Sequence, residues 1–149
     1  MKRFLVLFAC ALLATSASAD DASSLVKYRQ SVMKSMGAHM SAMSLVVKKQ
    51  VSSRAQLAAH AEAIRGVSDG LAAFFPAGTD PSRVTTAALP AIWQRSAEFS
   101  AAAQKLQREA AKLAAFAKSG DARGFDAQFE RVGAACNECH KQFRKRDSD

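Results

Sequence analysis

Cysteine is scarce in this chain of 149 residues, and so are the residues that break helices. The chain has three cysteines, three prolines and seven glycines. Cys10 lies in the leader described below, so only Cys136 and Cys139 belong to the rest of the chain. The few prolines and glycines, together with abundant alanine, favour an all-helical chain with no repeats and no second domain.

Long apolar runs and basic surfaces interleaved with aromatic residues are also missing. After residue 19 no stretch approaches the roughly 18 consecutive apolar residues that span a membrane. The formal charge is +8, but the basic residues are spread along the chain, so no nucleic-acid-binding module is indicated. The denser basic group Lys141, Arg144, Lys145 and Arg146 could attract an acidic redox partner, or could only complement the C-terminal end of a helix.

The first 19 residues are predicted to be a cleavable secretory signal. Lys2 and Arg3 are a basic start, an apolar stretch follows, and Ala17-Ser18-Ala19 is a small-residue cleavage site. Cleavage leaves one domain, residues 20–149, and lowers the formal charge by two. A lipoprotein signal ending at Cys10 is disfavoured, because too little apolar sequence precedes this cysteine.

Cys136-Asn137-Glu138-Cys139-His140 has the pattern of a covalent haem attachment site. Residues i, i+3 and i+4 of a helix share one face, so both sulfurs and the imidazole point the same way. Cys136 and Cys139 can then bond to the haem vinyl groups while His140 binds the iron. One covalent haem c per chain is the predicted cofactor, and it leaves no thiol for a structural disulfide. The motif and the leader together predict a periplasmic protein.

A Cys-x-x-Cys pair has two other common uses, as a redox dithiol and as half of a zinc site. Zinc takes four ligands, and outside the motif the mature chain has only His39 and His60 as further Cys or His residues. Haem attachment is therefore the favoured interpretation. His39 and His60 are expected at a helix surface or interface, with no functional role.

Apolar residues recur at steps of three and four in four segments, which predicts four amphipathic helices. They cover about residues 23–49, 53–75, 90–117 and 121–143. Ser53 and Gln56 form a predicted capping box, Pro90 suits a first helical position, and Gly120 and Asp121 separate the last two helices. Only the connection from residue 76 to residue 89 is long.

Such helices predict an antiparallel up-down-up-down four-helix bundle that encloses one haem. A repeat close to 3.5 residues favours a left-handed twist of the bundle. The cysteines lie on the core-facing stripe of the last helix, which consists of Phe125, Phe129, Val132, Cys136, Cys139 and Phe143.

The first helix interrupts its apolar stripe at Arg29, between Val26 and Met33. A guanidinium in a core needs an anion, and a haem propionate is the predicted partner, with Gln30 as a neighbouring donor. Alternatively, Arg29 extends its aliphatic stem past the core to solvent. Met33 lies one turn further on and faces the distal side of the iron, where it either binds the iron or only covers it.

Over nearly the whole mature sequence the chain resembles the cytochrome c′ family and its low-spin class II relatives. The matching motifs are Tyr28-Arg29-Gln30 followed by Met33, Pro90-Ala91-Ile92-Trp93, and Cys136-x-x-Cys139-His140-x-x-Phe143-Arg144. Class I cytochromes carry the haem motif near the N-terminus. Here only nine residues follow His140, so a sixth ligand has to come from upstream.

The resemblance implies a role for several residues. Arg29 and Gln30 are expected to contact haem, and Arg144 to lie near the proximal imidazole. The resemblance implies less strongly that Leu89 and Pro90 also contact haem. The resemblance also implies a homodimer packed through the first two helices, and a redox partner protein whose identity the sequence does not give.

The family divides by the coordination of the iron. Cytochrome c′ proper is five-coordinate and admits NO or CO past an apolar residue at the Met33 position, whereas low-spin relatives use a methionine from this region as sixth ligand and carry electrons. The Arg29-Gln30 pair favours the first type, and Met33 fits both. One-electron transfer, binding of a diatomic gas, or both are expected. A haem peroxidase is disfavoured, because His39 is six positions from Met33 and off its face, so no enzymatic activity is predicted.

Overall fold

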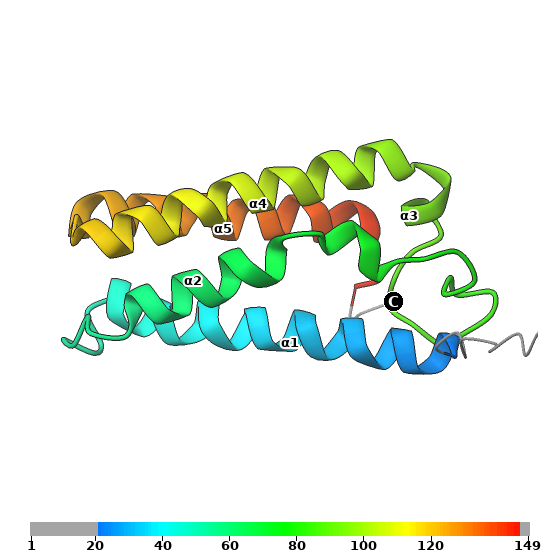
Figure 1. Ribbon diagram of the computed structural model, residues 1–149, viewed down its shortest axis with the longest axis horizontal. Helices are drawn as coiled ribbons and strands as arrows, with labels where there is room; N and C mark the ends of the chain where they lie inside the picture. The colour runs from blue at the N-terminus through cyan, green and yellow to red at the C-terminus, as the bar shows by residue number, and fades with distance from the viewer. Residues whose placement is uncertain (1–20, 147–149) are drawn as a thin grey trace, which may run out of the picture.

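The computed structural model describes residues 21–146, and this part of the chain is built from helices (Figure 1). They are α1 (Ala22–Val47), α2 (Leu57–Ser68), the 3-10 helix η1 (Leu71–Phe74), α3 (Ala91–Gln94), α4 (Ser96–Ser119) and α5 (Ala122–Phe143). Within residues 21–146 the only β-type pairing is an isolated bridge between Ala88 and Arg144. The predicted leader lies outside the described residues. None of the described helices has the length and apolar character that a membrane crossing requires.

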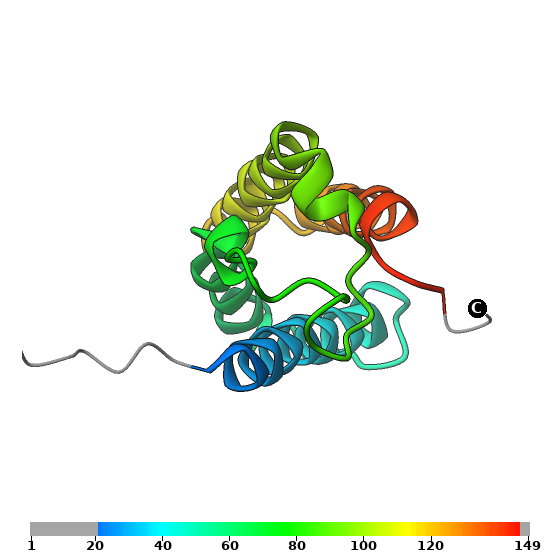
Figure 2. The same ribbon diagram turned by 90° about the vertical axis from the view of Figure 1, so that its right-hand side faces the viewer.

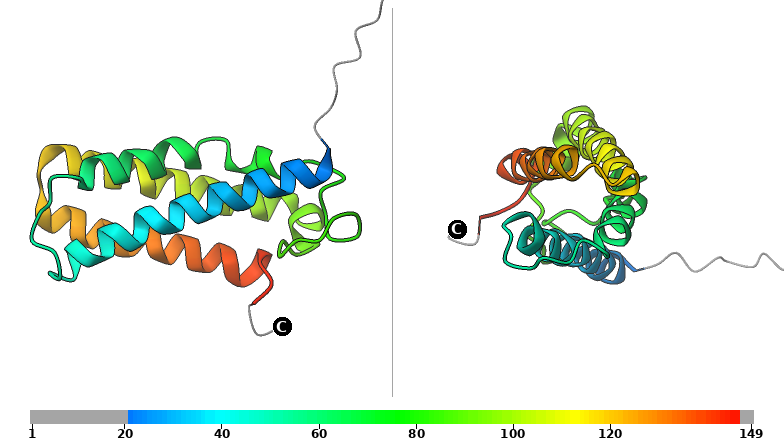
Figure 3. Two further views of the ribbon diagram at one scale, coloured as in Figure 1. Left: turned by 90° about the horizontal axis from the view of Figure 1, so that it is seen from below. Right: turned by 90° about the vertical axis from the view of Figure 1, so that its left-hand side faces the viewer.

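The four long helices follow one another around the bundle in chain order. α1 packs on α2, α2 on α4, and α4 on α5. Views along the bundle show the four helices around a common centre (Figures 2 and 3). Successive long helices run in opposite directions (Figure 1). The predicted up-down-up-down four-helix bundle is therefore confirmed.

Two helix starts follow from side-chain caps. Asp21 accepts hydrogen bonds from the backbone N–H and the hydroxyl of Ser24, at 2.9 and 2.8 Å, and so begins α1. Asp121 begins α5 in the same way by accepting the N–H of Gly124 at 2.9 Å. Gly120 ends α4 with a φ of 75°, a conformation that favours glycine. The predicted boundary between the last two helices is confirmed.

Three other predictions about helix boundaries are wrong. α2 begins only at Leu57, and its N-cap residue Gln56 makes no side-chain cap, so the capping box from Ser53 does not form. α2 also ends early, at Ser68, because Gly70 takes a φ of 67° and turns the chain into η1. The predicted third helix is broken at Arg95, whose φ of −121° separates α3 from α4. Pro90 precedes α3 as its N-cap.

Buried apolar side chains form two clusters. The main core is shared by α1, α2, η1, α4 and α5, and its buried members are Met36, Met43, Leu57, Ala61, Ile64, Leu71, Ala103, Leu106, Ala110, Leu113, Ala114, Phe125, Phe129, Val132 and Ala135. The second cluster, here called the aromatic cluster, has Ile92, Phe99 and Phe143 at its centre, with Phe75 and Trp93 packed against them. It lies where the loop before α3 crosses the end of the bundle (Figure 2).

Candidate functional site

α5 presents the Cys-x-x-Cys-His motif at the junction of the two clusters. Cys136 packs against the main core, whereas Cys139 packs against the aromatic cluster. Both side chains are half-buried, and neither forms a disulfide. His140 follows on the exposed surface of α5. The motif is thus helical, as its spacing predicts, and both sulfurs lie on the inner side of α5.

The two thiols are kept neutral by their apolar surroundings. Burial raises the pKa of Cys136, and burial together with the neighbouring Cys136 raises the pKa of Cys139 to about 11. A catalytic dithiol has the opposite property, because its nucleophilic cysteine has a lowered pKa. The redox-dithiol interpretation is therefore disfavoured, and the pair suits covalent attachment to an apolar group.

The imidazole of His140 is kept in its neutral form. Although the residue is exposed, partial desolvation of the ring lowers its pKa, and the positive charge of Arg144 lowers it further. A neutral imidazole has the lone pair that a metal ligand needs. Arg144 lies just beyond α5, and its N–H donates to the carbonyl of His140 at 3.1 Å. Arg144 is thus placed on the His140 side of the motif.

The segment before α3 is tied to the end of α5. The N–H of Leu89 donates to the carbonyl of Phe143 at 2.9 Å, and the N–H of Lys145 donates to the carbonyl of Ala87 at 2.7 Å. Because Phe143 is one helical turn beyond His140, this pairing brings Leu89 near the motif. Contact between Leu89 and haem stays a prediction.

Aromatic rings in edge-to-face pairs surround the inner side of the motif. The ring centroids of Phe99 and Phe143 are 5.3 Å apart, those of Phe75 and Phe99 are 4.8 Å apart, and those of Phe75 and Trp93 are 6.3 Å apart. The indole N–H of Trp93 donates to the carbonyl of Pro76 at 3.1 Å. These contacts hold the loop after η1, α3, α4 and α5 together around Cys139.

Arg29 is buried beside these rings, with only 2% of its surface exposed. Its guanidinium donates to the hydroxyl and carbonyl of Thr79, at 2.7 and 2.8 Å, and to the hydroxyl of Thr86 at 3.0 Å. The guanidinium carbon also lies 4.8 Å from the ring centroid of Phe75 and 5.6 Å from that of Trp93. Arg29 does not extend to solvent, so that interpretation is wrong.

The charge of Arg29 has no anion beside it in the described part of the chain. No salt bridge within residues 21–146 includes Arg29, and its hydrogen-bond partners are neutral oxygens. Burial lowers its pKa, which reflects the cost of a charge away from water. An anionic group brought to this end of the bundle would compensate that cost. The residues present therefore fit a haem with a propionate towards Arg29, and the contact itself stays a prediction.

The neighbours of Arg29 on α1 differ in their surroundings. Gln30 is exposed, whereas Met33 is half-buried and packs against the main core. Met36 and Met43 are buried in that core, and Met40 approaches α5, where its methyl carbon is 3.9 Å from the position of a Cβ on Gly133. Methionines of α1 therefore face α5 across the bundle.

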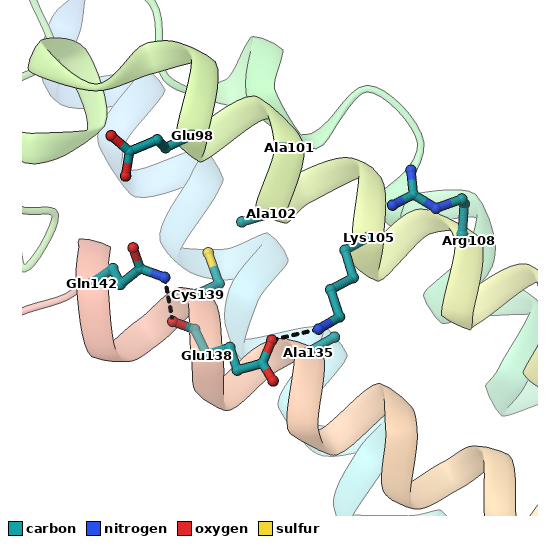
Figure 4. A pocket seen from close by; sticks show the side chains of 9 residues that line it. All are labelled: Glu98, Ala101, Ala102, Lys105, Arg108, Ala135, Glu138, Cys139 and Gln142. Carbon is teal, nitrogen blue, oxygen red and sulfur yellow. Dashed lines mark hydrogen bonds and ion pairs between the residues drawn. The ribbon is translucent and has the colours of Figure 1, made fainter.

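A groove separates α4 from α5 on the outer side of the motif (Figure 4). It has a volume of about 360 Å³ and is lined by Glu98, Ala101, Ala102, Lys105, Arg108, Ala135, Glu138, Cys139 and Gln142. The sulfur of Cys139 points towards Ala102 on α4 (Figure 4). Lys105 and Glu138 bridge the groove with an ion pair of 2.6 Å. Cys139 thus lies between the aromatic cluster on one side and this groove on the other.

Two sets of contacts have no signal in the sequence. Thr79 and Thr86 hold Arg29 although they lie 50 and 57 residues away from it. His39 and His60 meet between α1 and α2, where their Nδ1 atoms are 2.9 Å apart. The apolar pattern places both histidines near a helix interface, but no local motif indicates that they touch.

A four-helix bundle that presents Cys-x-x-Cys-His near the end of its last helix, beside a buried and uncompensated guanidinium, defines a bundle-type c-type cytochrome. The comparison with family models agrees, because residues 24–144 match the model described as Cytochrome C'. The chain belongs to the cytochrome c′ family. Members carry a covalently bound c-type haem, and Cys136, Cys139 and His140 are the residues of this chain that fit it.

Known relatives resemble the chain over most of its length. Cytochrome c' of Rhodospirillum rubrum is 36% identical over 146 residues, which are 97% of this chain and 99% of the relative. A nitric oxide complex of a mutant cytochrome c prime from Alcaligenes xylosoxidans superposes with a TM-score of 0.77 at 36% identity, and covers 86% of this chain and 100% of the relative. A carbon monoxide-bound variant of the same protein gives a TM-score of 0.77 at 36% identity. This alignment covers 85% of this chain and 98% of the relative.

Proposed function

We propose that this protein is a periplasmic monohaem cytochrome of the c′ type, which exchanges one electron and binds a diatomic gas such as NO or CO. When bound, the haem would supply both reactions, because its iron can change valence and can take a ligand besides His140. Complexes of similar proteins with nitric oxide and carbon monoxide support gas binding. The predicted leader at residues 1–19 supports export to the periplasm.

The residues of the chain have separate tasks in this proposal. Cys136 and Cys139 would hold the cofactor covalently on the inner side of α5, and His140 would supply a neutral imidazole to the iron. Arg29 compensates a propionate, and its hydrogen bonds to Thr79 and Thr86 keep the guanidinium in place. Because Arg29 is almost fully buried, its charge is expected to act strongly on the redox potential.

The packing of Met33 favours the five-coordinate c′ type over a type in which Met33 binds the iron. Met33 is half-buried against the main core, so its side chain is already held by apolar contacts on α1. A thioether in such packing covers the distal side and yields to a small gas by changing rotamer. Binding the iron instead would require Met33 to give up these contacts. We therefore expect a five-coordinate iron.

The histidine on α1, His39, does not compete for the distal role. His39 is engaged with His60 between α1 and α2, on another side of α1 from the expected distal face. A peroxidase needs such a group near the iron to assist cleavage of the O–O bond. The protein is accordingly proposed to carry electrons and gas without catalysing a reaction.

The absorption spectrum of the oxidised holoprotein tests the proposal, with Met33→Leu measured alongside. A high-spin spectrum that the substitution leaves unchanged, together with binding of NO and CO by the ferrous protein, is the expected result. A sulfur-to-iron charge-transfer band that Met33→Leu abolishes would contradict it. Met33 would then be the sixth ligand, and the protein a low-spin carrier of electrons only.

The family resemblance also leads to the proposal of a homodimer packed through α1 and α2. Large apolar side chains exposed in the described chain support it, because Tyr28 and Leu45 lie on α1 and are 56% and 46% exposed. Light scattering after size-exclusion chromatography should give twice the mass of one chain. Leu45→Glu should shift the protein towards the mass of one chain. If the parent and the Leu45→Glu variant have the same mass, this surface is not the dimer interface. A redox partner of unknown identity completes the proposed electron transfer.

A further inference from the structure

His39 on α1 and His60 on α2 form a direct side-chain contact. Their Nδ1 atoms are 2.9 Å apart, and their ring centroids are 5.1 Å apart at an interplanar angle of 55°. Both residues are half-buried, so the pair is held by the two helices and yet remains reachable from solvent. The proposed functions of the protein make no use of this pair.

The contact brings two imidazole nitrogens to one point. A neutral imidazole has one N–H and one lone pair, so a short contact between two Nδ1 atoms requires one ring to donate and the other to accept. When the donating ring takes its other tautomer, with the proton on Nε2, the Nδ1 lone pairs of both rings face the same small space. Two imidazole nitrogens converging in this way are the common beginning of a transition-metal site.

The separation of the nitrogens is close to that of two ligands on one metal ion. With metal–nitrogen bonds of about 2.0–2.1 Å, two ligands at a right angle are about 2.9 Å apart, and two ligands at a tetrahedral angle about 3.3 Å apart. The observed 2.9 Å is the length of the hydrogen bond in the metal-free pair, so either geometry is reached by a shift of about 0.4 Å or less. Adjacent nitrogens at right angles are typical of the tetragonal sites of Cu²⁺, which also binds such ligands more tightly than other divalent ions of its row.

α1 and α2 carry no like charge within one helical turn of the pair. The positions one helical turn away from either histidine carry no charge; they are Ser35, Met36, Ala42 and Met43 on α1 and Gln56, Leu57, Ala63 and Ile64 on α2. Within residues 21–146 no group of three or more His, Cys, Asp or Glu side chains is close enough to share an ion. The two imidazoles would therefore be the only such ligands, and water would complete the coordination.

We propose that His39 and His60 form a binding site for a divalent copper ion that links α1 to α2. The site is separate from the haem motif, because it lies on the other pair of helices. The chain has three histidines, and in the haem-loaded protein His140 is occupied by the iron. The pair is consequently the one source of free imidazole in the mature holoprotein.

The test is a titration of the mature, haem-loaded protein with Cu²⁺ held in a glycine buffer. Native mass spectrometry should show one Cu²⁺ per chain, and the electron paramagnetic resonance spectrum should show hyperfine coupling to two nitrogens of imidazole. His39→Gln and His60→Gln should each weaken binding by about tenfold or more, and the double variant should remove it. Ser35→Ala, one turn from His39 on α1, is the matched control and should bind as the parent does.

Binding that survives unchanged in the double variant would overturn the proposal, as would the lack of binding by the parent at millimolar Cu²⁺. The haem Soret band reports whether each variant is folded and loaded. If a histidine variant does not fold, the spectrum of the parent decides alone, because copper bound elsewhere on the surface would lack the coupling to two imidazole nitrogens.

Discussion

The main core and the aromatic cluster are both buried, but they are built in different ways. The main core consists of apolar side chains presented at helical spacing by four long helices. The aromatic cluster includes residues from the short helix α3 and from the loop before it, and it encloses the guanidinium of Arg29. The first arrangement follows ordinary rules of helix packing, whereas the second places a charge where an apolar side chain is expected.

This difference indicates where we expect the function of the bundle to be located. In the described residues, the half-buried thiols lie at the junction of the two clusters, His140 follows them on the surface of α5, and the buried cation of Arg29 lies beside the aromatic cluster. Local rules are often broken at functional sites, and the cost is met by stable packing elsewhere. The main core should therefore determine whether the protein folds, and the aromatic cluster should determine the properties of the haem. The following predictions test this division.

The largest effect is expected from removing the cysteines. Cys136→Ser with Cys139→Ser should abolish covalent attachment of haem, because no thiol remains in the mature chain to bond to the vinyl groups. Mass spectrometry of the denatured variant should then give the mass of the chain alone. The denatured parent should give the mass of a chain that begins at Asp20 plus one haem. Ala134→Ser, on the exposed face of α5, is the control and should retain the haem. Zinc or a disulfide in the parent would contradict the whole assignment.

Leu113→Ala should separate stability from haem properties. Leu113 is fully buried in the main core, and its truncation is expected to lower the free energy of unfolding by about 2–5 kcal/mol. The haem spectrum and potential should stay as in the parent. Phe99→Leu in the aromatic cluster should do the reverse, with a smaller loss of stability and a measurable shift of the potential. Urea unfolding and potentiometry on both variants check this, and equal effects on the potential would remove the distinction between the clusters.

Arg29→Leu should affect both properties. It leaves the oxygens of Thr79 and Thr86 without their donor, which is expected to cost about 1–3 kcal/mol of stability. If Arg29 also compensates a propionate, the redox potential and its pH dependence should change. Arg29→Lys keeps the charge but loses the forked geometry, so it should lose stability while keeping more of the parent's potential. A loss of stability with no change of potential would mean that Arg29 only ties the loop to α1.

Much of this division could be predicted from the sequence, because its causes are local. Periodicity predicts the long helices, Gly120 and Asp121 mark one boundary, and the break in the apolar stripe is enough to single out Arg29. The haem motif is equally local, since its spacing is the spacing of one helical face.

The parts that could not be predicted depend on contacts between distant segments. Ser53 has the sequence of a helix cap, but it lies in an irregular connection, a second turn follows at residues 55 and 56, and α2 starts only at Leu57. The break at Arg95 lies inside a continuous helical pattern, and it occurs where the preceding loop is pinned to the end of α5. The meeting of His39 and His60 depends on the register between α1 and α2. Such contacts are decided by tertiary packing and carry no local signature.

The smallest expected effect is an acid-dependent one on the α4–α5 interface. Glu109 on α4 accepts a hydrogen bond of 2.6 Å from the buried side chain of Gln128 on α5, and Lys112 donates to it at 3.1 Å. These bonds, first that of Gln128 and then that of Lys112, lower the pKa of Glu109 below its usual 4.5. The folded pKa is thus lower than the unfolded one, so the carboxylate stabilises the fold above pH 4.5, and this contribution is lost as the pH falls through the folded value.

Glu109→Gln should therefore lower the melting temperature at neutral pH and lose less stability than the parent on acidification. Gln128→Met, which removes the donor, should have the same effect. Thermal unfolding between pH 3 and pH 7 measures it, and the haem spectra of the folded variants should match that of the parent, because Glu109 and Gln128 are outside the aromatic cluster. A haem spectrum that changed with either substitution would show that the two parts of the bundle are coupled.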